Sequence, residues 1–222
     1  MTHSFDLRTA YGNFKSNLIF LRETNTLNKN QKILEIGCGL GGLLKYLLDQ
    51  GYDIRGTEID TEYLKKSKEL YGSLPITLVD SEILPFDDHS FDVVISFDVF
   101  EHLHDSDNHL KEVSRVLKDK GFYLLQTPNK YTNILFEIIR HKSLTLWMED
   151  HVSLHTYKEV IRRFNKNRYK IDFLNIPVVT DFFMSKLERY TGKIGLYFLK
   201  IINPDNLPIS FKTNFYIKAQ KL

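Results

Sequence analysis

Lys32-Ile-Leu-Glu-Ile-Gly-Cys-Gly-Leu-Gly-Gly42 is the most informative segment of the chain. Its apolar residues predict a short buried strand that ends in a run of glycines, and a helix is expected to begin at Leu43. Gly37, Gly39 and Gly41 carry no side chain, so the loop can turn sharply and a nucleotide-like ligand can approach its backbone. The segment therefore predicts a ligand site at the end of the strand.

Glu35 distinguishes between two kinds of ligand for this loop. Gly37, Gly39 and Gly42 also fit the dinucleotide pattern G-x-G-x-x-G, so the glycines alone do not identify a cofactor. A carboxylate two residues before the first glycine would repel a pyrophosphate over the loop, whereas it suits a cation. S-adenosylmethionine carries an ammonium and a sulfonium and no phosphate. The pattern E-x-G-x-G-x-G after a strand resembles the first motif of the class I S-adenosylmethionine-dependent methyltransferases.

Later segments resemble the remaining motifs of that family in the same order. Strands are predicted at 53–57, 76–79 and 91–96, and a fifth strand follows the turn Leu117-Lys-Asp-Lys-Gly121. The resemblance implies that Glu58 accepts hydrogen bonds from ribose hydroxyls and that Asp80 faces the adenine amino group. The cofactor-binding residues expected on these grounds are Glu35, Gly37, Cys38, Gly39, Glu58, Ile59, Asp80, Ser81 and Phe97.

Strands that alternate with helices predict a doubly wound, Rossmann-like α/β fold with right-handed crossovers. The resemblance implies a seven-stranded, mainly parallel sheet with an antiparallel last strand, and the sixth and seventh strands are expected at 169–178 and 214–220. Thr156, with Glu159 three residues on, indicates a capped helix before the sixth strand. The 222 residues are expected to form a single domain with a helical lead-in at 1–30, a cofactor-binding core at 30–130 and a C-terminal part at 131–222.

Composition indicates a globular protein, with 42% apolar and 26% charged residues. Cys38 is the single cysteine, so an internal disulfide is excluded, and its place in the glycine loop indicates a small space-filling residue rather than a reactive thiol. The first twenty residues lack the apolar core of a signal peptide, and no apolar run reaches the roughly eighteen residues of a membrane span. A cytoplasmic localisation is expected.

The insertion at 181–209 has apolar segments at 182–184 and 194–202 but is interrupted by charges. A substrate lid, an interfacial element at a membrane surface (182–202), a dimer surface and ordinary packing against the sheet all remain open. Residues 151–222 contain 13 Lys and Arg against 5 Asp and Glu, a net charge of +8, which leaves −6 for residues 1–150. This asymmetry is typical of an anionic partner near the C-terminal third, although a solvated basic face would give the same count.

Asp98-x-x-Glu101-His102 is the candidate catalytic segment. It resembles the acid-x-x-Glu-His of ubiquinone-biosynthesis O-methyltransferases and of small-RNA 2′-O-methyltransferases, in which this segment and a later histidine can hold a divalent metal. His151 resembles that later histidine, so a Mg²⁺ or Mn²⁺ site of Asp98, Glu101, His102 and His151 is one interpretation. In the other two, His102 is a general base or only packs. His104, His109 and His141 are expected at the surface or at helix ends.

These residues favour a methyltransferase, with transfer from S-adenosylmethionine to oxygen of a small-molecule, lipid-linked or glycan acceptor. Methyl transfer needs an acceptor held in line with the methyl group, and a hydroxyl acceptor also needs a base or a metal. Two alternatives remain: a nicotinamide-dependent oxidoreductase, and a non-catalytic S-adenosylmethionine-binding protein. The sequence contains no recognisable RNA-binding module, and no motif constrains the acceptor or the oligomeric state.

Overall fold

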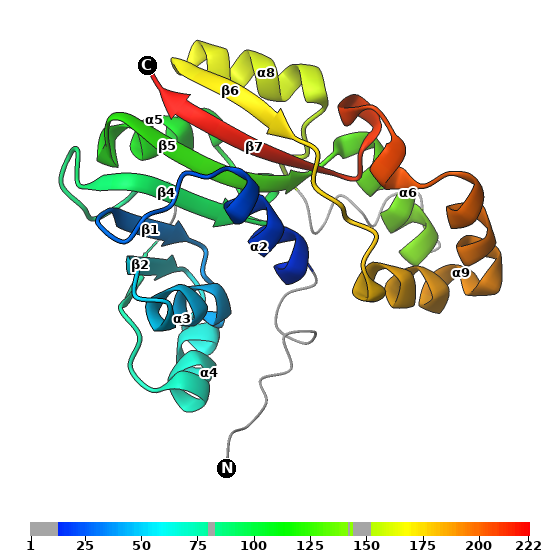
Figure 1. The fold of residues 1–222 in the computed structure, drawn as a ribbon, viewed down its shortest axis with the longest axis horizontal. Helices are drawn as coiled ribbons and strands as arrows, with labels where there is room; N and C mark the ends of the chain where they lie inside the picture. The colour runs from blue at the N-terminus through cyan, green and yellow to red at the C-terminus, as the bar shows by residue number, and fades with distance from the viewer. Residues whose placement is uncertain (1–12, 80–82, 142, 144–151) are drawn as a thin grey trace.

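The computed structural model describes residues 13–79, 83–141, 143 and 152–222 (Figure 1). In these residues, seven strands form one sheet in the order β3-β2-β1-β4-β5-β7-β6. The strands are β1 Lys32–Ile36, β2 Asp53–Glu58, β3 Ile76–Leu78, β4 Phe91–Phe97, β5 Leu117–Pro128, β6 Tyr169–Leu174 and β7 Asn214–Lys221. The first five pair in parallel, whereas β7 lies antiparallel between β5 and β6. The predicted fold class is confirmed.

Helices cover both faces of the sheet, and each face has its own apolar core (Figure 1). On one face, α5 (Ser106–Val116) packs against β5 and α8 (Tyr157–Lys166) against β5 and β6, with Val94 and Phe164 fully buried. On the other, α2 (Phe14–Glu23) packs against β4 and β7, and α3 (Gly42–Asp49) packs against β2, with Ile33 and Phe20 fully buried. Each such side chain stabilises the fold by about 1.5–3 kcal/mol, which explains why the central strands read as continuous apolar runs.

Side chains of the predicted types begin several helices. Asp60 begins α4 (Thr61–Tyr71) and accepts a hydrogen bond from the backbone N–H of Glu62 at 2.7 Å. The predicted capping box at α8 is confirmed, because Thr156 and Glu159 each accept a hydrogen bond from the backbone N–H of the other residue. Each such cap contributes about 1 kcal/mol.

His109 corrects one expectation from the sequence. It is fully buried, and its Nε2 lies 2.9 Å from the hydroxyl of Tyr123 in the core between α5 and the sheet. It was expected at the surface or at a helix end. The reason for the error is helical geometry, because His109 shares the buried face of α5 with Val113 and Val116.

The C-terminal part adds two helices beside the sheet, α6 (Lys130–His141) and α9 (Asp181–Ile201) (Figure 1). They contact each other through Phe136 and Tyr190, whose ring centres are 5.9 Å apart. Gly192 breaks α9 into two helical segments, with a φ of 64° and a ψ of −161°. Among the described residues, no helix combines the length and the apolar character that crossing a bilayer requires.

Candidate active site

The loop after β1 approaches the loop after β4 so closely that a side chain at Gly37 is excluded. Gly37 has a φ of 65°, and a Cβ built there would lie 2.4 Å from Cγ2 of Val99. Cys38 is fully buried, and burial raises the pKa of its thiol. A thiol with a raised pKa is a poor nucleophile, which agrees with a space-filling role.

Glu58 connects two loops at the carboxyl end of the sheet. Its Oε2 accepts a hydrogen bond from the backbone N–H of Gly39 at 2.6 Å, and its Oε1 accepts hydrogen bonds from those of Ile59 and Asp60 at 2.9 and 3.0 Å. A carboxylate offers about four acceptor positions, so at least one stays available to a ligand. The backbone thus fixes the carboxylate before any ligand arrives.

Glu35 is buried at the end of β1, and Oε2 of its carboxyl has no hydrogen-bond partner among the described residues. Burial and the charge of Glu58 raise its pKa to about 8, although the backbone N–H of Leu44 opposes the shift. A nearby cation would favour the ionised form. The carboxyl is not, however, part of the cavity wall described next, so its effect on a bound cation would act through space.

A cavity of about 490 Å³ opens beside the glycine loop. Five of the expected cofactor-binding residues line it, namely Gly37, Gly39, Glu58, Ile59 and Phe97. Asp80, Ser81 and His151 lie outside the residues that the structure describes. The cavity also has walls that sequence reasoning missed, formed by Thr57, Tyr63, Val79, Val99, Leu103 and His104. Tyr63, on the helix that follows β2, is 44% exposed.

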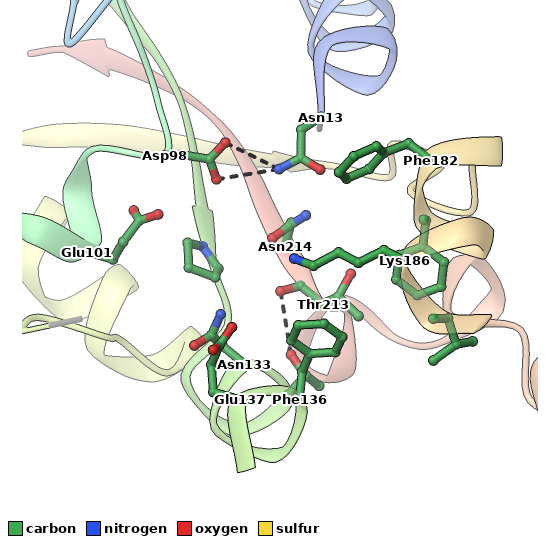
Figure 2. A pocket seen from close by; sticks show the side chains of 14 residues that line it. Asn13, Asp98, Glu101, Asn133, Phe136, Glu137, Phe182, Lys186, Thr213 and Asn214 are labelled. Carbon is green, nitrogen blue, oxygen red and sulfur yellow. Dashed lines mark hydrogen bonds between the residues drawn. The ribbon is translucent and has the colours of Figure 1, made fainter. Parts of the chain in front are cut away.

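Asp98 stands at the end of β4 with a φ of 53°, a backbone conformation that residues other than glycine rarely adopt. Its backbone N–H donates to both oxygens of Gln126, the carbonyl O at 3.3 Å and Oε1 at 3.1 Å. Asn13 donates to its carboxylate at 3.3 Å (Figure 2). Desolvation raises the pKa of this carboxyl, and the amides and the charges of His102 and Lys186 oppose the shift. A strained backbone such as that of Asp98 is often found at functional sites.

The side chains of Glu101 and His102 lie in different cavities, although the two residues are adjacent in the sequence. The short 3-10 helix η1 (Phe100–His102) buries Glu101, whose Oε2 accepts a hydrogen bond from Thr127 Oγ1 at 3.0 Å. Burial, together with the charge of Asp98, raises the pKa of Glu101 well above its usual range. His102 is exposed instead and lines the cavity beside the glycine loop.

A second cavity, of about 280 Å³, lies between the sheet, α6 and α9 (Figure 2). Asp98 and Glu101 form one wall, and Glu137 and Lys186 reach it from the two helices. Asn13, Asn133, Phe136, Phe182, Thr213 and Asn214 also line it. Asn133 Oδ1 and Thr213 Oγ1 are buried and have no hydrogen-bond partner in the described part of the chain.

Asp98 is the residue that the two cavities share. A ligand in the cavity beside the glycine loop and a second ligand between α6 and α9 would therefore meet at its carboxylate. Residues 13–79, 83–141, 143 and 152–222 contain no group of three His, Cys, Asp or Glu placed to hold a metal ion. Because His151 is not among them, the four-residue metal site stays a prediction.

Comparisons with known proteins agree with this geometry. Residues 34–125 match the family described as "Methyltransferase domain". A probable S-adenosylmethionine-dependent methyltransferase of Mycolicibacterium smegmatis is 34% identical over 100 residues, 45% of this chain and 39% of that protein. A ubiquinone biosynthesis O-methyltransferase of Pelagibacter ubique is 26% identical over 193 residues, 80% of this chain and 79% of that protein.

A solved S-adenosylmethionine-dependent methyltransferase of Mesorhizobium loti superposes with a TM-score of 0.64, over 95% of this chain and 98% of that chain. At 12% identity this likeness shows the fold alone. The alignment with the Mycolicibacterium protein spans less than half of that protein. The glycine loop, the fixed acid at the end of β2 and the sheet order all agree with the family match, and residues 34–125 are a class I S-adenosylmethionine-dependent methyltransferase domain.

Proposed function

We propose that this protein transfers the methyl group of S-adenosylmethionine to an oxygen atom of a small-molecule, lipid-linked or glycan acceptor. The cofactor occupies the cavity beside the glycine loop, and the acceptor occupies the cavity between α6 and α9. The observation that carries this proposal is that Asp98 belongs to both cavities. A donor and an acceptor on the two sides of one side chain have the proximity that an in-line displacement requires.

In the transfer, the acceptor oxygen forms a bond to the methyl carbon while the carbon–sulfur bond breaks, and S-adenosylhomocysteine leaves. The hydroxyl proton must go to a base. Glu101 is the candidate, because it lines the acceptor cavity and its pKa is raised well above the usual range of a carboxyl. A base with a raised pKa takes a proton more effectively near neutral pH. The oxygen acceptor is also in keeping with the Pelagibacter relative, which is named as an O-methyltransferase.

His102 has a different proposed role, since it lines the donor cavity rather than the acceptor cavity. The imidazole would contact the cofactor, and its charge when protonated lowers the pKa of Asp98. Desolvation still raises the pKa of Asp98 overall, so the cationic end of the cofactor beside it would be what favours the ionised carboxylate. Removal of His102 should therefore change the affinity for S-adenosylmethionine more than the proton transfer.

A divalent metal remains part of the proposal. Burial raises the pKa values of Asp98 and Glu101, and the charge of Asp98 raises that of Glu101 further. Mg²⁺ and Mn²⁺ prefer such oxygen ligands. The ion would polarise the acceptor oxygen. Loss of activity with a chelator, and recovery with Mg²⁺ or Mn²⁺, is the expected result if these residues hold an ion. Activity that is indifferent to chelation would leave Glu101 acting as a base without a metal.

The test combines calorimetry with a labelled-methyl assay over a panel of hydroxylated and amino acceptors. S-adenosylmethionine should bind with an affinity in the micromolar range, about −8 kcal/mol. Glu101→Gln should retain this binding and lose at least about a hundredfold in turnover, in keeping with the usual contribution of a general base. Glu112→Gln is the matched control, because Glu112 pairs with Arg115 on α5, outside both cavities. Tight NADH binding without S-adenosylmethionine binding would overturn the proposal, and so would full turnover in Glu101→Gln.

A further inference from the structure

The second half of α9 exposes an apolar stripe to solvent. Its side chains are 58% to 69% exposed and comprise Ile194, Tyr197, Phe198, Ile201 and Ile202. The spacing of three, four and seven residues from Ile194 places Tyr197, Phe198 and Ile201 on the same face of the helix, and Ile202 follows directly where the helix ends. Leu196 and Leu199, between them in sequence, are half-buried. The stripe is thus the outer face of an amphipathic segment rather than scattered surface residues.

The charge of this segment has one sign. Between Gly192 and Ile202 the sequence has two charged residues, Lys193 and Lys200, and no acid. Lys193 is exposed next to Ile194. A short apolar stripe flanked by lysines, with a tyrosine within it, has the composition of helices that lie in the interface of an anionic bilayer. A contact between copies of the chain would not by itself require cations at its border.

The neighbouring helix α6 also exposes apolar side chains. On α6, Tyr131, Leu135 and Ile139 are exposed at intervals of four residues, so they also share one helical face. The two helices are in contact, since Lys186 Nζ lies 4.5 Å from the ring centre of Phe136. Gly192 interrupts α9 between the turns that line the acceptor cavity and the turns that carry the stripe. The stripe can therefore face outward while the first segment keeps its place at the cavity.

We propose that the second half of α9 docks on the surface of an anionic lipid bilayer. Ile194, Tyr197, Phe198, Ile201 and Ile202 enter the boundary between headgroups and acyl chains, and Lys193 contacts lipid phosphate. The helix lies in the membrane plane. Monomeric proteins rarely leave contiguous apolar surface of this kind open to water, which is the physical reason for a partner. The docking is independent of which acceptor is methylated.

The test is flotation with vesicles of phosphatidylcholine, with and without phosphatidylglycerol. The full chain should float with the anionic vesicles and only weakly with the neutral ones. Ile194→Gln combined with Phe198→Gln should weaken the partition more than tenfold, because two apolar side chains no longer enter the bilayer. Lys193→Gln should weaken it about fivefold, and only for anionic vesicles.

Leu70→Gln is the matched control, because Leu70 is 56% exposed on α4, which contributes no residue to the stripe. This variant should float like the unmodified chain. Retained S-adenosylmethionine binding in every variant shows that the fold is intact. The proposal is overturned if the double variant floats normally, or if neutral vesicles bind as tightly as anionic ones. A different result would identify a contact between copies of the chain instead. In that case the unmodified chain would not float, and sedimentation would show that it is a dimer whereas the double variant is a monomer.

Discussion

Replacing Gly37 with alanine gives the most direct test of the donor cavity. The substitution has two separable costs. An L-residue at a φ of 65° loses about 1–2 kcal/mol relative to glycine. The new Cβ, 2.4 Å from Cγ2 of Val99, must also displace that side chain, and overpacking of this kind costs about 1–3 kcal/mol. The free energy of unfolding should therefore fall by about 2–5 kcal/mol.

Gly51→Ala separates the two costs. Gly51 has a φ of 83°, and the nearest atom to its added Cβ is Lys29 Nζ at 3.6 Å, an ordinary contact with a flexible side chain. This control should lose only the backbone contribution, about 1–2 kcal/mol. Val99→Ala removes the methyl group that clashes, so in the Gly37→Ala background it should restore about 1–3 kcal/mol relative to the sum of the two single effects.

The assays are urea unfolding for stability and calorimetry for S-adenosylmethionine. Val99 lines the donor cavity, so its displacement should also weaken cofactor binding at least tenfold in Gly37→Ala and not in Gly51→Ala. The double variant should recover part of this affinity. Equal destabilisation by the two glycine substitutions, with no coupling to Val99, would refute the argument that this close approach shapes the cavity.

Two further predictions concern the acids beside the loop. Glu58→Ala should weaken S-adenosylmethionine binding by about 1–3 kcal/mol in calorimetry, because the ribose loses a charged acceptor; unchanged affinity would contradict that role. The pKa of Glu35 is raised to about 8, so the stability of the unliganded protein should be greatest below the unfolded value near 4.5 and should be lost as the pH rises towards 8. Glu35→Gln should flatten this dependence in thermal unfolding at a series of pH values, and an unchanged slope would show that another group causes it.

The sequence indicated which residues gather beside the glycine loop because the doubly wound fold determines where its parts meet. Parallel strands end at one edge of the sheet, so Gly37 and Glu58, each next to a strand end, necessarily lie near one another. The hydrogen bond from Gly39 to Glu58 joins residues 19 positions apart and follows from that edge. Tyr63 was missed because its spacing fits a buried helical face equally well.

The acceptor side could not be predicted in the same way. Asn13 and Asp98 are 85 residues apart, and the cavity between them also depends on Glu137 and Lys186 from α6 and α9. No strand order constrains how these two helices sit, so no motif could place their side chains together. A weak signal was present, because Asn133 and Glu137 are spaced by one helical turn on an otherwise largely apolar helix.

Asp98, Glu101 and His102 show where sequence reasoning reached its limit. Their spacing predicted three groups converging on one point, as an ordinary helical turn would place them. The left-handed backbone at Asp98 and the 3-10 turn that follows direct Glu101 into one cavity and His102 into the other. Sequence alone gives little warning of a positive φ at an aspartate, because most aspartates do not adopt it. The strained residue thus separates Glu101, in the proposed acceptor cavity, from His102, in the proposed donor cavity. Substitutions of the two residues should therefore have different kinetic consequences. Glu101→Gln should lower kcat, whereas His102→Gln should chiefly raise KM for S-adenosylmethionine. Equal changes in both parameters for the two variants would mean that the groups act at one point after all.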